Sequence, residues 1–401
     1  MRIDLTEWES VGGLDLSPDV VQQLARSAAF TVAPDASNPG RWTLTAQQHV
    51  GIARVDDLEL RVRPKVPPHR LVELMSASLD RVAWDDRDGT WEASHELVPT
   101  IAGAFLATAE RALRSGILQG YVTEEASLYA VRGRIDLSRQ LSRNPGLPLP
   151  IAVTYDEYTT DILENQLLAG AGRLLLRLPG LPLSLLHRLR RLEYQLLEVT
   201  PSRPSPNPVP VRWTRLNLRY RPALTLARII LQCGALDFEG EPTTNAPAFL
   251  IDMNKVFEDV VGNAVREALA PDLAVDLQRR DYLDAQRQVQ IRPDILISTG
   301  GHAAAVADVK YKRVGERGVS PNDVYQALAY ASRYGLAECT LIYPEAPRVD
   351  RLEVGGVTIR LAEVRIDVPP AARDAAIRQL ADRMVLNNPS QRHVAFTGEL
   401  K

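Results

Sequence analysis

Three charged residues in the second half of the chain have the types and spacing that metal-assisted chemistry needs. Asp294 follows Pro293 at the start of one expected strand, and Asp308 and Lys310 lie two positions apart on the next. Residues i and i+2 of a strand share a face, so Asp308 and Lys310 project together. With Asp294 opposite them, two carboxylates that can bind Mg²⁺ meet beside one ammonium. Such a site can direct an activated water at a phosphorus atom and stabilise the charge that develops there.

The turn between the two strands decides whether the carboxylates meet. We expect the strands over 289–298 and 303–311, joined around a Gly-Gly pair. A plain two-residue loop would pair Asp294 with Ala307 and turn Asp308 to the other face of the sheet. A three- or five-residue loop, or a β-bulge that restores the same parity, pairs Asp294 with Asp308 instead. We predict one of these arrangements, because glycine adopts the required positive φ at little cost.

Two flanking helices carry three further candidate residues. Glu258 borders the core-facing side of the helix that follows Asp252, from which it can reach the metal at the sheet edge. Gln326 and Tyr330 are four positions apart on the helix after Ser320, so they lie one above the other and can order the lysine or the substrate. The alternatives are a boundary charge for Glu258 and packing alone for the glutamine–tyrosine pair.

Lysine is rare in this chain, where it accounts for five of the 47 basic residues. We therefore expect a lysine that is present at such a site to be needed as a lysine. Arginine cannot replace it where a proton has to be exchanged, because the guanidinium stays protonated.

The elements expected around the charged group alternate between helix and strand. An apolar face at helical spacing begins at Val256 and predicts a helix. Ser320 and Pro321, with an acid at the third helical position, are typical of a helix start, and Gly335 is typical of a helix end. Further strands are expected over 273–277 and 339–343.

The first 240 residues carry separate β and helical patterns. Alternation of apolar and polar residues predicts strands, and dense Leu at three- and four-residue spacing predicts helices. The expected strands span 42–45, 50–55, 58–63 and 129–137. The expected helices span 70–79, 97–113, 161–178, 183–197 and 222–234. A loop over 144–150 and a proline-rich connector over 201–210 separate these regions.

These patterns predict a mixed fold, part α+β and part α/β, in three domains. We expect residues 1–150 to form an N-terminal domain with a β-sheet and helices. Residues 151–240 are expected to form a helical region, with its proline-rich connector, packed on the C-terminal core. Residues 241–401 are expected to form the α/β domain that carries the carboxylates.

Composition excludes several classes of protein. The formal net charge is −3 over 401 residues, which argues against coating nucleic acid by bulk charge but leaves room for a local basic groove. Two cysteines are too few for a disulfide scaffold or a four-cysteine metal site. The N-terminus has no apolar signal segment and no run is long enough to cross a membrane, so we expect a cytoplasmic protein. None of the six histidines lies in a hydrolase nucleophile motif.

The order of these motifs resembles the PD-(D/E)xK nuclease superfamily. The chain has Glu258 on a helix, then Pro293-Asp294, Asp308-x-Lys310 and Gln326-x-x-x-Tyr330. More closely, it resembles McrC, the nuclease subunit of McrBC-type modification-dependent (type IV) restriction systems. The segments that carry this likeness are 308–313, 323–326 and 341–344, with weaker matches upstream at 63–65, 131–136 and 155–158. Val309 departs from the small residue expected there and leaves the catalytic positions intact.

The resemblance implies a Mg²⁺-dependent endodeoxyribonuclease of antiviral defence with a restriction-endonuclease-like core over 241–401. It implies catalytic roles for the six residues named above and metal ligation by Asp294, Asp308 and Glu258. It also implies a partner, an McrB-like AAA+ GTPase hexamer that reads modified cytosine in double-stranded DNA. The domain over 1–150 would dock on that partner and stimulate its GTP hydrolysis. The chain has no Gly-x-x-x-x-Gly-Lys-Ser/Thr loop, so we expect it to bind no nucleotide itself.

Two alternatives remain open. One is a catalytically inactive adaptor that keeps the nuclease fold to activate the partner motor, against which the intact Asp294, Asp308 and Lys310 argue. The other is a stand-alone RecB-like nuclease, which would not need the first 240 residues. A Cas4-like nuclease would require a cysteine cluster that two distant cysteines cannot supply.

Overall fold

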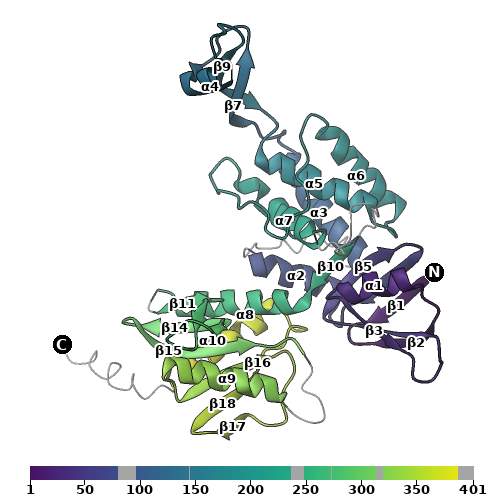
Figure 1. Ribbon diagram of the computed structural model, residues 1–401, viewed down its shortest axis with the longest axis vertical. Coiled ribbons are helices and arrows are strands. Elements are labelled where there is room, and N and C mark those ends of the chain that lie inside the picture. Colours follow the sequence, from purple (N-terminus) through teal and green to yellow (C-terminus); the bar gives the residue numbers. More distant parts are fainter. Residues whose placement is uncertain (80–95, 144, 236–247, 272, 313–318, 387–401) are drawn as a thin grey trace.

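The computed structural model describes residues 1–79, 96–143, 145–235, 248–271, 273–312 and 319–386. The fold mixes helices and sheets, as predicted. Figure 1 shows an elongated molecule with a C-terminal α/β half at one end, an N-terminal β region beside it and a helical region next along the long axis. A narrow β arm forms the opposite end. Among the described helices, none is both long and apolar enough to cross a membrane.

Two small sheets form the N-terminal region. The first has the order β1-β6-β5-β10, with β1 (Arg2–Thr6), β5 (His49–Val55), β6 (Leu58–Arg63) and β10 (Phe249–Asp252). The second has the order β2-β4-β3, with β2 (Ser10–Leu14), β3 (Phe30–Pro34) and β4 (Trp42–Ala46), and α1 (Pro18–Arg26) beside it. The strands expected over 42–45, 50–55 and 58–63 are confirmed. In β6 every second residue is buried, whereas in β5 every residue except Arg54 is buried.

Strand β10 does not belong with the C-terminal sheet, although the sequence assigned residues 241–401 to one domain. It pairs with β5, from Phe249 opposite Ile52 to Asp252 opposite His49. Gly51 has φ +136, and a Cβ there would collide with the Phe249 carbonyl oxygen. Its missing side chain therefore permits the close approach of β10, the strand directly before α8, to the N-terminal sheet.

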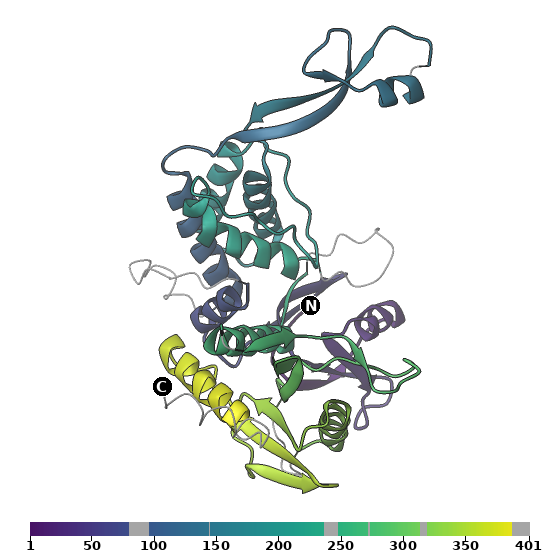
Figure 2. The same ribbon diagram turned by 90° about the vertical axis from the view of Figure 1, so that its left-hand side faces the viewer.

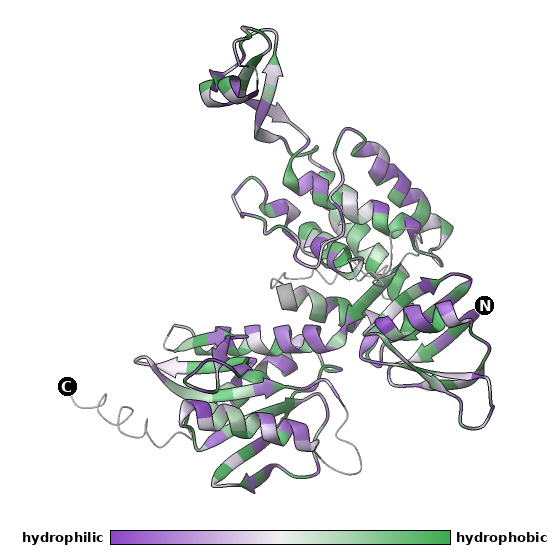
Figure 3. Cartoon of the chain, viewed as in Figure 1, coloured by the Kyte–Doolittle hydropathy of each residue, from purple (hydrophilic) through white to green (hydrophobic). Residues whose placement is uncertain are grey.

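Five longer helices make the helical region: α2 (Pro68–Leu79), α3 (Leu97–Leu113), α5 (Leu163–Arg177), α6 (Leu183–Gln195) and α7 (Arg221–Cys233). Hydrophobic residues of α3, α5 and α7 gather where these helices face one another (Figure 3). Helix α3 packs mainly against α2, α6 and α7, and it also contacts β5 of the N-terminal sheet. The helices match the expected spans, and the proline-rich connector over 201–210 is irregular as expected.

The β arm is the region where the elements predicted from the sequence differ most from those in the structure. Its two long strands are β7 (Gly120–Leu128) and β9 (Ile151–Thr159), with the short β8 (Arg134–Ile135) and α4 (Leu137–Arg143) at the tip. Of the strand expected over 129–137, only the two residues of β8 form a strand. The apolar residues there are exposed, whereas β7 is a polar strand with no buried face, so alternation of burial could not reveal it. The paired strands also cross the boundary expected at 150.

A six-stranded sheet with the order β11-β14-β15-β16-β18-β17 forms the C-terminal half. Its strands are β11 (Ala274–Leu277), β14 (Ile295–Thr299), β15 (His302–Val309), β16 (Glu338–Tyr343), β17 (Arg351–Val354) and β18 (Val357–Glu363). Helices α8 (Met253–Leu269) and α10 (Pro370–Leu386) cover one face, and α9 (Pro321–Tyr334) covers the other (Figure 1). Strands β15, β16 and β18 run parallel, whereas β14 runs antiparallel to β15.

The expected strand over 289–298 is interrupted. Strand β13 (Gln290–Ile291) pairs only with β12 (Asp281–Tyr282), and β14 begins after Asp294. Pro293 has no backbone N–H for a ladder, and the side chain of Asp294 takes the N–H of Val309. Because of this break, residues 278–294 form a short excursion: the chain leaves the sheet after β11 and returns to it at β14.

The register between β14 and β15 follows the β-bulge alternative. The loop is the Gly-Gly pair alone, with φ +55 and +83, and Thr299 pairs with His302. The register then shifts by one residue between Ile297 and Ser298, so that Ile295 pairs with Ala307. This shift brings Asp294 and Asp308 to facing positions, as predicted.

Candidate active site

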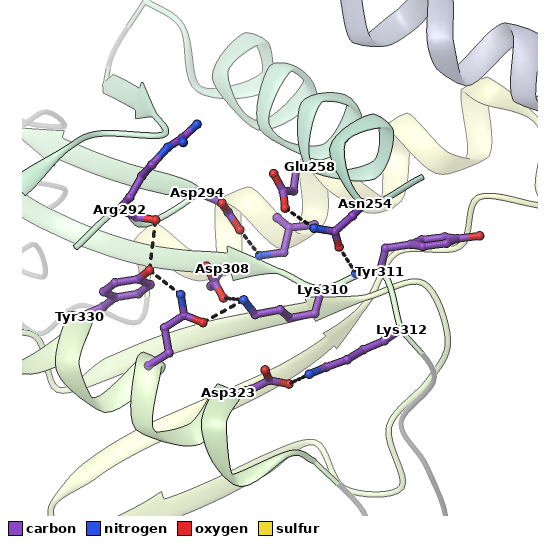
Figure 4. Close-up of polar contacts among 12 residues, drawn as sticks. Asn254, Glu258, Arg292, Asp294, Asp308, Lys310, Tyr311, Lys312, Asp323 and Tyr330 are labelled. Carbon is purple, nitrogen blue, oxygen red and sulfur yellow. Dashed lines mark hydrogen bonds and ion pairs between the residues drawn. The ribbon is translucent and has the colours of Figure 1, made fainter. Parts of the chain in front are cut away.

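The two aspartates meet at the ends of β14 and β15. Both are buried, with exposed fractions of 9% for Asp294 and 1% for Asp308. Oδ2 of Asp294 accepts a hydrogen bond of 2.7 Å from the backbone N–H of Val309, the residue after Asp308. Figure 4 shows both carboxyl groups pointing to the same side of the sheet end.

Lys310 lies at the same place, as the two-residue spacing predicted. Its Nζ is 2.5 Å from Oδ2 of Asp308 and donates a hydrogen bond of 2.9 Å to Oε1 of Gln326. Nε2 of Gln326 in turn donates to the hydroxyl of Tyr330 (2.7 Å), and this hydroxyl donates to the carbonyl oxygen of Arg292 (3.0 Å). The glutamine and tyrosine therefore link the lysine of the site to α9 and to the segment that carries Asp294.

Glu258 reaches the site from α8, on the other side of the sheet. Oε1 accepts a hydrogen bond from Nδ2 of Asn254 (2.7 Å), and Oε2 accepts one from Nε2 of Gln278 (3.2 Å). The same Nε2 donates to Oδ1 of Asp294 at 2.5 Å. One amide therefore joins Glu258 to Asp294. The structure brings together all six residues that the sequence singled out: Figure 4 shows Glu258, Asp294, Asp308, Lys310 and Tyr330, and Gln326 lies beside them through its hydrogen bond to Lys310.

Two polar residues of this network were missed. Gln278 directly follows β11 and has φ +54, a left-handed backbone that a non-glycine residue adopts only when the surroundings compensate. No spacing of residues in the sequence predicts a left-handed backbone at this position. Asn254 lies four residues before Glu258, and its Oδ1 accepts from the backbone N–H of Tyr311. That i, i+4 spacing on a helix was a signal that could have been used.

Burial and mutual repulsion of the carboxyl groups dominate the electrostatics of the site. Burial, and then the charge of Asp294, raises the pKa of Glu258 to about 8. The same two causes raise the pKa of Asp308 to about 7, although Lys310 opposes the shift. Burial works against the charge of Lys310, but the Asp308 carboxylate outweighs it, so the pKa of Lys310 is raised. Perturbed carboxyl groups gathered around one lysine are typical of functional sites.

The donor set fits a hard divalent cation held by few protein ligands. Oδ2 of Asp308 is buried and, apart from its ion pair with Lys310, makes no hydrogen bond of acceptable geometry. A cation beside Asp294 and Asp308 would relieve the repulsion between them, and Mg²⁺ is usually bound by one or two carboxylates plus water. Within the described ranges, no group of three or more His, Cys, Asp or Glu residues forms a ready-made metal cage. The fit therefore depends on the two aspartates.

Comparisons with known proteins bear on the family and the fold of the chain. The family model described as "McrBC 5-methylcytosine restriction system component" matches residues 44–344. No curated protein matches the chain. One solved chain belongs to a refined half-complex from a tetradecameric assembly of Thermococcus gammatolerans McrB AAA+ hexamers with bound McrC. It is 18% identical with a TM-score of 0.58, over 96% of this chain and 100% of that one, which shows a shared fold. A chain of the T. gammatolerans McrBC complex is 20% identical with a TM-score of 0.40, over 67% and 88%.

Proposed function

The chain belongs to the family of McrBC 5-methylcytosine restriction system components, which confirms the resemblance to McrC, and on this premise we propose that it is the DNA-cutting subunit of such a system. The observation that carries the proposal is the convergence of Asp294, Asp308 and Lys310 at the end of one β-hairpin. This arrangement, in a sheet with helices on both faces, supports a PD-(D/E)xK nuclease core. The reaction class is hydrolysis of a DNA phosphodiester.

Asp294 and Asp308 would hold Mg²⁺, with Glu258 as a proposed third oxygen donor; when bound, the ion would polarise a phosphoryl oxygen and lower the pKa of a water molecule. The ammonium of Lys310 is already held beside these carboxylates, where it can donate to the phosphate and stabilise the charge that develops. Gln326 keeps the ammonium in that place through its hydrogen bond. Gln278 holds Asp294 and Glu258 in fixed orientations, which reduces the reorganisation needed during the reaction.

The partner proposed for this chain is an McrB-like AAA+ GTPase, since the matched family belongs to the McrBC system and the similar solved assembly contains McrB AAA+ hexamers with bound McrC. The β arm supports a docking role for the segment before the nuclease half. It projects to the end of the molecule opposite the C-terminal sheet (Figures 1 and 2). Its apolar side chains are strongly exposed, among them Tyr129 (81%), Leu141 (71%) and Tyr121 (76%). Exposed apolar surface of this kind marks a binding site for another protein.

The test is reconstitution of the full chain with an McrB-like partner, GTP, Mg²⁺ and methylated duplex DNA. We expect cleavage by the parent chain, and its loss in Asp308→Asn with partner GTPase stimulation retained. Stimulation of GTP hydrolysis without any cleavage by the parent would identify an adaptor instead. Rapid cleavage by the chain alone would favour a stand-alone nuclease.

A further inference from the structure

We call residues 278–294 the arm. It lies beside the candidate active site and is distinct from the β arm formed by β7, β8, α4 and β9. It leaves the site at Gln278 and returns to it at Asp294, and both side chains take part in the carboxylate network. In Figure 2 the green segment between β11 and β14 extends outward from the sheet. The arm therefore lies directly beside the carboxylates of the site.

Every exposed charged side chain of the arm is an arginine. Arg279, Arg280, Arg287 and Arg292 are all exposed. Arg279 pairs with Asp276 of β11. In the part of the chain that the structure describes, no carboxylate lies within ion-pair distance of the other three. Figure 4 shows the side chain of Arg292 extending away from the carboxylates. Guanidinium groups without an acidic partner are suited to phosphate oxygens.

The acidic residues of the arm are used internally. Asp281 accepts from Arg333 (3.1 Å) and from the hydroxyl of Tyr334 (3.3 Å), which ties the base of the arm to α9. Asp284 accepts from the backbone N–H groups of Gln288 and Val289 and so closes the turn at the tip. The carboxylates therefore stiffen the arm, while the arginines face solvent. A stiff arm loses little conformational entropy when it binds.

From these observations we propose that the arm over 278–294 contacts the backbone of duplex DNA beside the scissile phosphate, through Arg280, Arg287 and Arg292. The inference rests on the proposed nuclease function. The spacing supports it: Arg280 lies two residues after Gln278 and Arg292 two before Asp294, a step of about 7 Å along extended chain. Arg287, at the tip, can contact the DNA backbone several base pairs further along the duplex. Contacts of this kind fix the register of the protein on DNA and carry no base information.

The test uses the full-length chain and a fluorescent duplex of about 30 base pairs, with EDTA present to prevent cleavage. We expect Arg280→Gln/Arg287→Gln to weaken binding roughly tenfold and to reduce the slope of log K against log salt by about 2. Arg280→Lys/Arg287→Lys keeps the charge and should keep most of the slope. Arg351→Gln, an exposed arginine on β17 at the opposite edge of the sheet, is the matched control and should bind as the parent does.

Cleavage by each variant in complex with the GTPase partner separates the possible failures. Unchanged DNA binding and cleavage in the glutamine variant would overturn the inference and leave the nuclease function intact. Loss of partner binding with DNA binding unchanged would overturn it as well, since the arm would then face an acidic protein surface. A parent chain that neither binds nor cuts DNA would refute the nuclease function, and the inference with it.

Discussion

The hydroxyl of Tyr311 donates a hydrogen bond of 2.8 Å to Oε2 of Glu7, a residue 304 positions earlier in the chain. Both groups are buried, and Oε1 of the same carboxylate accepts from the backbone N–H of Lys65. Tyr311 follows Lys310 directly, and its own N–H bonds to Asn254, which holds Glu258. Glu7, which directly follows β1, is thus connected through Tyr311 to Lys310 on one side of the candidate active site and through Asn254 to Glu258 on the other.

We expect Tyr311→Phe to lower the free energy of unfolding by about 1–3 kcal/mol, because it leaves a buried carboxylate without one of its donors. Cleavage in the reconstituted complex should also fall, since the backbone beside Lys310 loses its anchor. Denaturant unfolding and cleavage rate measure the two effects. Tyr194→Phe, at an exposed tyrosine, is the matched control. An unfolding free energy equal to that of the parent would show that the Tyr311–Glu7 bond contributes nothing.

Glu7 gives a second prediction, on the pH dependence of stability. Burial raises the pKa of Glu7 above its ordinary 4.5, although hydrogen bonds from Tyr311 and Lys65 oppose the shift. The folded state therefore holds the proton more tightly than the unfolded state. The contribution of Glu7 to stability is greatest below pH 4.5 and is lost as the pH rises through the folded value.

Glu7→Gln mimics the protonated side chain and removes this dependence. The melting temperature of the parent should fall relative to that of the variant between about pH 4.5 and neutral pH. Thermal melts of both proteins over that range measure the difference. A difference in melting temperature between parent and variant that is the same at every pH would show that Glu7 has the same pKa in the folded and unfolded states.

The third prediction concerns Tyr330, which we propose acts as a positioning residue through Gln326. Tyr330→Phe removes the hydroxyl that links Gln326 to the Arg292 carbonyl. We expect kcat of DNA cleavage to fall roughly tenfold with KM little changed, because the lysine is less well held. Tyr325→Phe, at an exposed tyrosine of the same helix, is the control. Equal effects of the two changes would indicate a general effect on α9 and not a positioning role.

Sequence patterns predicted the facing positions of Asp294 and Asp308, because these positions depend on local periodicity. The parity of the hairpin required Asp294 and Asp308 to face each other, and the structure meets it with a bulge. The bulge itself, rather than a longer loop, could not be chosen from the Gly-Gly pair. The helix expected over 97–113 was confirmed residue for residue, since it has a continuous apolar side.

What the sequence did not predict depends on tertiary context. Gln278 enters the site only because a strained backbone at the end of β11 aims its amide between two carboxylates. Strand β7 has no buried face, so its sequence does not show the alternation that predicts a strand. Only its pairing with β9 identifies it as one. Strand β10 looks like the start of the C-terminal half, and only its pairing with β5 shows where it belongs.

The fourth prediction separates docking from cleavage. Tyr129→Ser and Leu141→Ser remove exposed apolar side chains at the tip of the β arm and should abolish stimulation of the partner's GTPase. Melting temperature of the isolated chain should not change, because neither side chain is buried. Leu386→Ser, which is 68% exposed at the end of α10, is the control and should stimulate normally. Full stimulation by both tip variants would place the docking surface elsewhere.

The fifth prediction tests the cation site without an activity assay. A ligand that binds only the folded state raises its stability, so Mg²⁺ at many times its dissociation constant should raise the melting temperature by a few degrees. Asp294→Asn and Asp308→Asn each remove one of the two proposed ligands and should abolish that rise. Asp276→Asn, at an exposed aspartate on β11, keeps the site and should show the full rise.

Glu258→Gln then distinguishes the roles of the three carboxylates. Its carboxylate is joined to Asp294 through the amide of Gln278, so a third-ligand role predicts a rise that is reduced but still present. A rise equal to that of the parent would show that Glu258 only orients Asp294. An equal rise in Asp294→Asn and Asp308→Asn would show that Mg²⁺ binds elsewhere on the protein, and the proposed metal ligands would be wrong.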